Sequence, residues 1–408
     1  MTTTQQTSAL EALAEQQPKL RDLLDAPIET QRARGYFHTL REICQQPSTW
    51  LATCETMLGA APEIARSTDG IKSLVLTGSG SSEFAGACVR LPLESDLGII
   101  AESIGGGTLL TFASPALAPV RPGLVVSLSR SGESPESLAT VAMLLESEPE
   151  LRHLILTCNA QGGLARAYPN DPRVALVTLD DRTNDRSLVM TSSFTNLVLA
   201  ARFLGYLEKR GEYRALCHRL SRIADALLRS SFSIFRDLAR RDFDRVVFLG
   251  DGARFGSARE AALKMLEMTA GRVPVVPETY LGLRHGPMSF VSDHTLIVCF
   301  LASDTRRRAY EIDLIRELDR KKLGLAKLIL GERIPPELIG ERDVAIECEG
   351  LADAGDDNAP VIDVLVGQLL AFFRCLEEGL KPDSPSDAGV ISRVVESFPL
   401  HNPPWDGA

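Results

Sequence analysis

The stretches "SLVLTGSGSSEFAGACVRLPLE" (residues 73–94) and "RVVFLGDGARFGSAREAALKMLE" (residues 245–267) have the same pattern. Each begins as an apolar, β-branched strand, continues through a glycine-bearing turn, and ends as a helix that opens with small residues. A strand followed by a turn and a helix is typical of a parallel α/β sheet. Because the pattern occurs twice, the sequence predicts an internal duplication.

Further apolar runs predict the other strands of two sheets. Longer helical patterns separate these runs, which indicates parallel strands joined by crossover helices. A helical region at about residues 187–240 contains few breakers and is expected at the seam between the two halves. The expected strands are residues 73–78, 123–129, 153–158 and 174–179 in the first half, and 245–250, 295–301, 325–330 and 343–348 in the second.

The domain organisation follows from the length and the duplication, because 408 residues exceed one ordinary core. We expect an α/β fold with two tandem domains, each a mainly parallel sheet flanked by helices in a three-layer αβα arrangement of flavodoxin-like topology. The expected bounds are a helical extension at 1–50, a first domain at 51–215, a second domain at 216–381 and a tail at 382–408.

The composition excludes several classes of protein. With 44% hydrophobic and 24% charged residues, the chain is typical of a soluble globular protein. No apolar run reaches the ~20 residues of a membrane span, and the polar start lacks the features of a secretory signal, so we expect a cytoplasmic protein without a membrane partner. The net charge of −10 and the lack of a basic stripe interleaved with aromatics argue against nucleic-acid binding.

The eight cysteines are scattered along the chain. They form no CxxC pair and no cysteine–histidine cluster with the spacing of metal ligands. We therefore expect free, buried thiols and no metal site.

The stretch "SLSRSGESPESL" (residues 127–138) predicts a phosphate site. Ser134 precedes a proline and is a good helix cap, so the turn directs free N–H groups and the positive end of a helix dipole at whatever lies above it. In an α/β sheet this turn lies at the carboxyl end of a strand, where ligands bind. A capped helix alone would explain Ser134 but not Ser129, Arg130 and Ser131 as well.

Two other turns predict contacts to the same ligand. In "TGSGSSEF" (residues 77–84), Ser81 and Ser82 open a helix, but the lysine of a nucleotide P-loop and the third glycine of a dinucleotide fingerprint are missing. A sugar or its phosphate suits this turn better than ATP or NAD. The turn "LVMTSSFTN" (residues 188–196) adds Thr191 and Ser192 to the pocket, or simply caps a helix.

The acid–base candidates lie in the second half of the chain. Glu260, Lys264 and Glu267 share one face of a helix that is otherwise rich in Ala, Leu and Met, which predicts a charged stripe lining a cavity. The alternative is a surface Glu–Lys pair worth a few tenths of a kcal/mol. Partial burial would raise a carboxylate pKa towards the range that suits proton transfer. His285 lies in a loop, "TYLGLRHGPMSF" (residues 279–290), that could close on a ligand or be merely solvated.

Together, "GSGSS", "SRSGES" and "EAALKMLE … LRHGP" resemble the tandem sugar isomerase (SIS) domain proteins. "RHLILTCNAQGGLA", "NDRSLVMTSSF" and "LGLRHGPMSFV" are similar to the AgaS group, whose members are described as tagatose-6-phosphate ketose/aldose isomerases or galactosamine-6-phosphate deaminases. The resemblance runs from about residue 32 to 400. It implies two tandem SIS domains, the first binding phosphate and the second carrying the catalytic helix.

The resemblance also implies roles for the residues. The family phosphate loop falls on Ser129–Ser134, the sugar-contacting turn on Ser81 and Ser82, and the glutamate that moves a proton between C1 and C2 on Glu267. His285 matches a histidine assigned to ring opening that the adjacent subunit contributes, so a homodimer is implied. Glu260 and Lys264 match the other polar members of the catalytic helix, which leaves open which glutamate is the principal base.

One departure from the family concerns the tail. The SIS proteins include the isomerase half of glucosamine-6-phosphate synthase, which carries a lysine in its C-terminal tail near the sugar. The comparable stretch here, "DAGVISRVVES", offers Arg393 and no lysine, so a Schiff-base step there is doubtful. The amidotransferase half that supplies ammonia is also missing, so the chain should release ammonia or simply isomerise.

We therefore expect conversion of galactosamine 6-phosphate to tagatose 6-phosphate and ammonia, without metal or redox cofactor. Plain aldose–ketose isomerisation and deamination of glucosamine 6-phosphate are alternatives that use the same proton shuttle. A non-catalytic sugar-phosphate sensor is a third reading, and it leaves the polar helix without a purpose.

Overall fold

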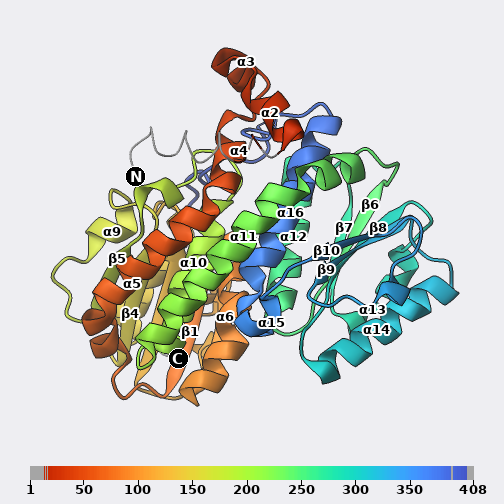
Figure 1. The fold of residues 1–408 in the computed structure, drawn as a ribbon. Helices are drawn as coiled ribbons and strands as arrows, with labels where there is room; N and C mark the ends of the chain where they lie inside the picture. Colours follow the sequence, from red (N-terminus) through yellow and green to blue (C-terminus); the bar gives the residue numbers. More distant parts are fainter. Residues whose placement is uncertain (1–12, 14, 16, 387–388, 402–408) are drawn as a thin grey trace.

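The computed structural model describes residues 13, 15, 17–386 and 389–401, which form two α/β units with helices packed between them (Figure 1). Each unit has a five-stranded, fully parallel sheet. The first sheet has the order β2-β1-β3-β4-β5, with β1 (Ser73–Gly78), β2 (Ile100–Gly105), β3 (Gly123–Ser129), β4 (Leu151–Thr157) and β5 (Val174–Thr178). The second has the order β10-β9-β8-β6-β7, with β6 (Arg245–Leu249), β7 (Val275–Glu278), β8 (Thr295–Phe300), β9 (Ala326–Gly331) and β10 (Val344–Glu347).

The duplication is visible in both topology and local geometry. Renumbered within its own unit, each sheet has the flavodoxin-like order 2-1-3-4-5. The first strand of each sheet passes through a glycine of positive φ into a helix: Gly80 (φ 57°, ψ −123°) leads to α6 (Ser81–Leu97), and Gly252 (φ 60°, ψ −126°) leads to α12 (Ala253–Met268). Residues with a Cβ rarely adopt this conformation. The predicted duplicated α/β fold is confirmed.

Helices cover both faces of each sheet. On the first sheet, α5, α6 and α10 pack on one face and α7, α8 and α9 on the other. On the second sheet, α12 and α16 lie on the inner face and α13 and α14 on the outer face. The helices not yet bounded are α2 (Pro18–Leu24), α3 (Ile28–Ala33), α4 (Phe37–Cys44), α5 (Gln46–Thr68), α7 (Gly106–Phe112), α8 (Pro135–Ser147), α9 (Gly163–Ala167), α10 (Ser192–Arg202), α11 (Arg210–Ala239), α13 (Tyr280–Leu283), α14 (Thr305–Arg320), α15 (Leu351–Ala354) and α16 (Pro360–Glu377).

One continuous apolar core joins the two units. It includes Leu74 and Leu76 of the first sheet, Val246 and Leu296 of the second, and the inward faces of the helices between them. Figure 1 shows α11 and α16 running through the middle of the molecule. This position explains why α16, "PVIDVLVGQLLAFFRCLE", is almost entirely buried.

Two close contacts hold α12 between its neighbours. A Cβ added to Gly256 would lie 2.7 Å from the backbone nitrogen of Cys88 on α6, and one added to Gly367 of α16 would lie 2.5 Å from the Cβ of Ala261 on α12. Real Cβ atoms do not approach other atoms so closely, so glycine is required at both positions. The helix that carries the charged stripe is therefore fixed against both units.

Most expected elements are present. All eight expected strands begin and end within two residues of the observed strands, whereas β2 and β7 were not expected. The helical region at 187–240 is α10 and α11, separated by a 3₁₀ turn at Phe203–Tyr206, and α11 packs at the seam against α5 and α16. The expected boundary at 215–216 falls inside α11, and the domain bounds stay predictions. In the described ranges, no helix is both long and apolar enough to cross a membrane.

Candidate active site

The carboxyl ends of β1 and β3 bring two serine-rich turns together. These strands are hydrogen-bonded neighbours, with Thr77 beside Ser127. The turn after β1 starts α6 at Ser81, and the turn after β3 starts α8 just beyond Ser134. The chain order reverses between β1 and β3, and ligands bind at such switch points in open α/β sheets.

The turn after β3 presents hydrogen-bond donors that have no partner in the described chain. The Ser129 hydroxyl oxygen accepts the N–H of Gly132 at 2.9 Å, and the Ser131 hydroxyl oxygen accepts the N–H of Glu133 at 3.2 Å, so each hydroxyl proton is left for another partner. The N–H groups of Ser131 and Ser134 make no hydrogen bond to any described residue. Neutral hydroxyls and free N–H groups at the start of a helix form a good anion site.

Arg130 is engaged with the backbone near this turn. Its buried guanidinium donates to the carbonyl oxygens of Ser187 (3.3 Å) and Leu188 (2.9 Å), and also to that of Arg393 in the tail. Burial lowers the pKa of Arg130, while carboxylates that include Glu267 act in the opposite direction. Arg130 therefore connects the turn after β3 to the loop before α10 and to the tail. Its contact with phosphate stays a prediction.

The charged stripe on α12 meets the turn after β1. The Lys264 ammonium lies 2.5 Å from a carboxylate oxygen of Glu267, 3.2 Å from one of Glu260 and 3.0 Å from the Ser81 hydroxyl. Lys264 and Glu260 are fully buried, whereas the Glu267 side chain keeps 22% of its surface exposed. A solvated surface pair is therefore excluded.

Burial and neighbouring charges shift the pKa values of Glu260 and Lys264. Burial raises the pKa of Glu260 to about 7; the nearby Lys264 ammonium opposes this shift and the Glu267 charge adds to it. Burial alone would lower the pKa of Lys264, but the two carboxylates outweigh it and raise that pKa. Lys264 is thus held as a cation, which suits a charge partner better than a nucleophile.

The loop before α10 closes another side of the site. The Ser82 hydroxyl contacts the sulfur of Met190 at 3.8 Å, which joins this loop to α6. The Thr191 hydroxyl is buried and makes no hydrogen bond within the described chain. The Ser192 hydroxyl instead donates to Asp185, within the loop's own network. Ser192 is therefore engaged within the loop, whereas a ligand contact of Thr191 stays a prediction.

Two buried carboxylates that were not expected hold this loop. Asp185 accepts the N–H groups of Thr191 and Ser193, both at 2.8 Å. Glu42 of α4 accepts the N–H of Arg186 at 2.6 Å, and burial together with the Asp185 charge raises the pKa of Glu42 to about 8. The only sequence signal was the preference of Asp for turns, since nothing in the sequence links α4 to this loop.

The extension and the tail also meet at this loop. The Asp383 carboxylate accepts the N–H of Thr39 at 2.7 Å, at the start of α4. The Arg393 guanidinium donates to the Asp185 carbonyl oxygen at 2.7 Å and to the Asn184 side chain at 2.6 Å. The start of α4 and the described part of the tail therefore support the walls of the site.

His285 lies apart from these residues. It is exposed in the loop between α13 and the 3₁₀ turn at Pro287–Phe290, in the second unit. Its backbone N–H donates to the Gly282 carbonyl at 2.9 Å, and no described contact joins its side chain to the α12 stripe or the serine turns. Within one chain, the structure does not bring His285 to the site.

The described residues outside this site include a cavity and the eight cysteines. Among the described residues, no group of three or more His, Cys, Asp or Glu side chains could hold a metal ion. A cavity of about 340 Å³ lies at the amino ends of β9 and β10, at the edge of the second sheet away from the carboxyl ends of its strands. All eight cysteines are buried, free thiols, as expected.

Comparisons with known proteins agree with this geometry. No family model matches the chain. The chain is 32% identical to D-galactosamine-6-phosphate deaminase AgaS of Shewanella sp., over 90% of this chain and 92% of that one, and 31% identical to the AgaS deaminase of Escherichia coli O157:H7, over 90% and 96%. A crystal structure of tagatose-6-phosphate ketose/aldose isomerase from Escherichia coli has a TM-score of 0.80 at 28% identity, covering 90% of this chain and 96% of that one.

Proposed function

Because the chain belongs to the AgaS family of tandem SIS-domain proteins, we propose that it converts galactosamine 6-phosphate to tagatose 6-phosphate and ammonia. The observation that carries the proposal is the ion pair between Lys264 and Glu267 beside Ser81, next to the free donors of the turn after β3. The pair on α12 thus lies near the carboxyl ends of β1 and β3, which supports a proton-transfer group beside an anion site. Similar relatives bear the name of this activity.

The reaction would start with the phosphate bound by Ser129, Ser131 and Ser134, which anchors the open-chain sugar. Glu267 then takes the proton from C2 and returns it to C1, while one proton of the amine nitrogen is transferred to O1. The C1 aldehyde thereby becomes an alcohol, and the amine-bearing C2 becomes an imine. Addition of water to the imine releases ammonia and leaves the ketose. Holding the substrate by its phosphate lets one carboxylate serve both carbons.

Glu267 is the proposed base, with Glu260 as its buried partner. Glu267 is partly exposed, so it can reach a substrate, whereas Glu260 is fully enclosed. The Lys264 ammonium, 2.5 Å away, pairs with the Glu267 carboxylate and orients it. The chemistry on these residues needs no metal and no redox cofactor.

The alternatives share the same shuttle. Isomerisation without nitrogen loss would need the same transfer between C2 and C1, and glucosamine 6-phosphate differs only at C4. The tail gives no support to a Schiff-base step, because Arg393 binds Asn184 and the Asp185 backbone.

We place the enzyme in the cytoplasm, where free thiols persist.

The proposed function is tested by measuring ammonia and ketose formed from galactosamine 6-phosphate and from glucosamine 6-phosphate. We expect ammonia and tagatose 6-phosphate from the first substrate, and at least tenfold lower kcat/KM for the second. Interconversion of tagatose 6-phosphate with its aldose, without ammonia from either amino sugar, would overturn the deaminase and leave an isomerase. Ligand binding without turnover of any of these sugars would leave a sensor.

We propose further that the enzyme is a homodimer in which His285 completes the site of the neighbouring subunit. The exposed His285, without contact to the site of its own chain, supports this arrangement. A co-expressed heterodimer of Glu267→Gln and His285→Gln subunits, purified through two tags, is then expected to have about half the wild-type activity. Each mutant homodimer should be nearly inactive.

The reason is that one of the two sites would receive both intact residues. A heterodimer no more active than the two mutant homodimers would show that both residues act within the same chain. A heterodimer of the Glu267→Gln subunit with wild type gives the matched value for a dimer with one intact site.

A further inference from the structure

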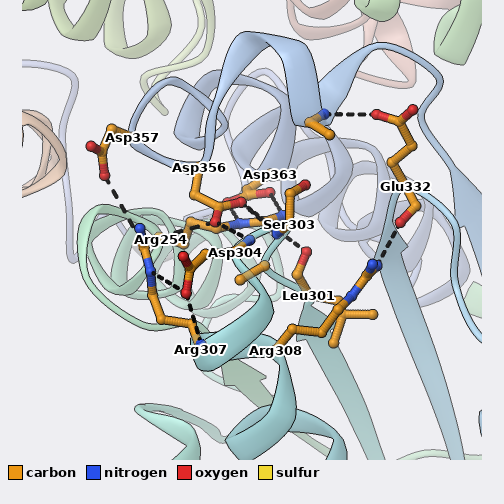
Figure 2. A network of polar contacts seen from close by, with 12 residues as sticks. Arg254, Leu301, Ser303, Asp304, Arg307, Arg308, Glu332, Asp356, Asp357 and Asp363 are labelled. Carbon is orange, nitrogen blue, oxygen red and sulfur yellow. Dashed lines mark hydrogen bonds and ion pairs between the residues drawn. The ribbon is translucent and has the colours of Figure 1, made fainter.

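The loop after β8 corresponds in the second unit to the serine turn after β3, because both lead from the third strand of a unit into a helix. In this loop, the chain's own carboxylates occupy the backbone donors. Asp356 accepts the N–H of Ser303 at 2.7 Å through one oxygen and that of Asp304 at 3.0 Å through the other, as Figure 2 shows. Glu311 accepts the preceding N–H, of Ala302, at 2.7 Å.

The first unit differs in the charge of the groups around its loop. There, the acceptors of the loop N–H groups are the neutral hydroxyls of Ser129 and Ser131. The acidic residue of that turn, Glu133, is exposed, and its carboxylate accepts the N–H of Gly163 instead. The turn after β3 therefore has neutral acceptors and could take an external anion, whereas the loop after β8 already binds the carboxylate of Asp356.

The surroundings of Asp356 are those of a bound anion. Its side chain is only 4% exposed, and its oxygens lie 3.9 Å from the Arg254 guanidinium and 4.0 Å from that of Arg307. Arg254 is fully buried and donates to Asp363 of α16 at 2.5 and 2.9 Å. Two N–H groups and two guanidinium groups thus face one carboxylate.

Arg254 connects this anion to the catalytic helix. It lies in the first turn of α12, the helix that carries Glu260, Lys264 and Glu267. Ser257, one turn later, also donates to Asp363 at 2.9 Å. The start of α12 is therefore fixed by buried charges that Asp356 helps to balance.

We propose that Asp356 is an internal anion that fills the second unit's counterpart of the phosphate loop, and that it acts through Arg254 as a positioning residue for the catalytic helix. The comparison with a phosphate loop rests on the proposed function of the first unit. The duplication would then have produced one loop that binds substrate and one that the chain itself has closed.

The test replaces the internal anion with a small external one. Asp356→Ala is expected to lower Tm by about 5 °C, because it leaves two partly buried N–H groups without their acceptor and removes the carboxylate that lies 3.9 Å from the Arg254 guanidinium. Formate at 100 mM should restore at least half of this loss, compared with chloride at the same ionic strength. Asp357→Ala is the matched control, since this neighbouring carboxylate is about half exposed (47%) and pairs with Arg307 at 3.9 Å. It should lose little Tm and gain nothing specific from formate.

Activity gives the second readout. Asp356→Ala should lower kcat about tenfold with KM changed less than threefold, and formate should restore kcat. Asp356→Asn, which keeps the shape and one acceptor oxygen, should lose less Tm than Asp356→Ala and supplies the folded comparison if the alanine variant does not fold. The proposal is overturned if formate acts equally on wild type, Asp357→Ala and the Asp356 variants, or if Tm does not fall. The Tm measurements need no turnover, so they remain decisive even if the proposed reaction is wrong.

Discussion

Replacing Glu267 with glutamine is expected to lower kcat about 100- to 10,000-fold while KM for the sugar phosphate changes less than threefold. Glutamine keeps the shape of the side chain but cannot accept and return a proton. The phosphate would still be held by the turn after β3, which Glu267 does not enter. Steady-state kinetics of ammonia release from galactosamine 6-phosphate measure both parameters.

Glu260→Gln is the matched comparison, because it changes the other carboxylate that faces Lys264. We expect it to lower kcat much less, since Glu260 is fully buried and Lys264 and Glu267 remain paired. The reverse result, with Glu260→Gln inactive and Glu267→Gln active, would identify Glu260 as the base. Exchange of the C2 hydrogen with deuterium from solvent would verify that the lost step is the proton transfer.

Replacing Lys264 with methionine is expected to lower the free energy of unfolding by about 3–5 kcal/mol near pH 8. Methionine has similar length but no charge, so two carboxylates would face each other without their cation. Glu260 is fully buried and would bear most of this penalty. Urea denaturation of the two proteins measures the difference.

The loss should be smaller at pH 5.5 than at pH 8. The pKa of Glu260 in the folded protein is about 7, above its ordinary value of 4.5. The folded state therefore binds this proton more tightly than the unfolded state, and the group's contribution to stability falls as pH rises from about 4.5 through 7. Without Lys264 the folded pKa rises further, so protonation relieves more of the penalty in acid.

Lys321→Met is the control for this prediction. Lys321 also pairs with a glutamate four residues away on a helix, Glu317 at 2.7 Å, but half of its side chain is exposed. It should change stability little at either pH. A loss for Lys264→Met that is equal at the two pH values, or no larger than the control, would contradict the role of the buried charges.

The fold could be predicted because its signals are local. Buried strands of a parallel sheet form nearly continuous apolar runs, as in "TLIVCF" of β8, and the repeated turn identified the duplication. The strands β2, "IAESIG", and β7, "VVPE", lie next to the first strand of their sheets and at the sheet edge, where side chains are only partly buried. Their polar residues and the proline of β7 interrupt the apolar pattern, so the sequence did not predict these two strands.

The site was only partly predictable, for a different reason. The spacing of Glu260, Lys264 and Glu267 on one helix face is a local property, and so is the serine cluster before α8. The joining of Lys264 to Ser81 depends on how α12 packs against α6, which no local pattern encodes. Glu42 and Asp185 could not be predicted for the same reason. They bind backbone N–H groups of the loop before α10, and Glu42 does so only because α4 packs against this loop.

The continuous core between the two sheets limits how a substrate can enter. A hinge motion that separated the two units would expose the apolar faces of α11, α12 and α16 to water. The free energy of this exposure would lie far above ordinary thermal energy. Entry and exit must therefore depend on the loops at the carboxyl ends of the strands, while the scaffold beneath them stays rigid. Turnover in this protein would then follow the opening of loops, as in enzymes with mobile lids, and would depend little on the swinging of domains.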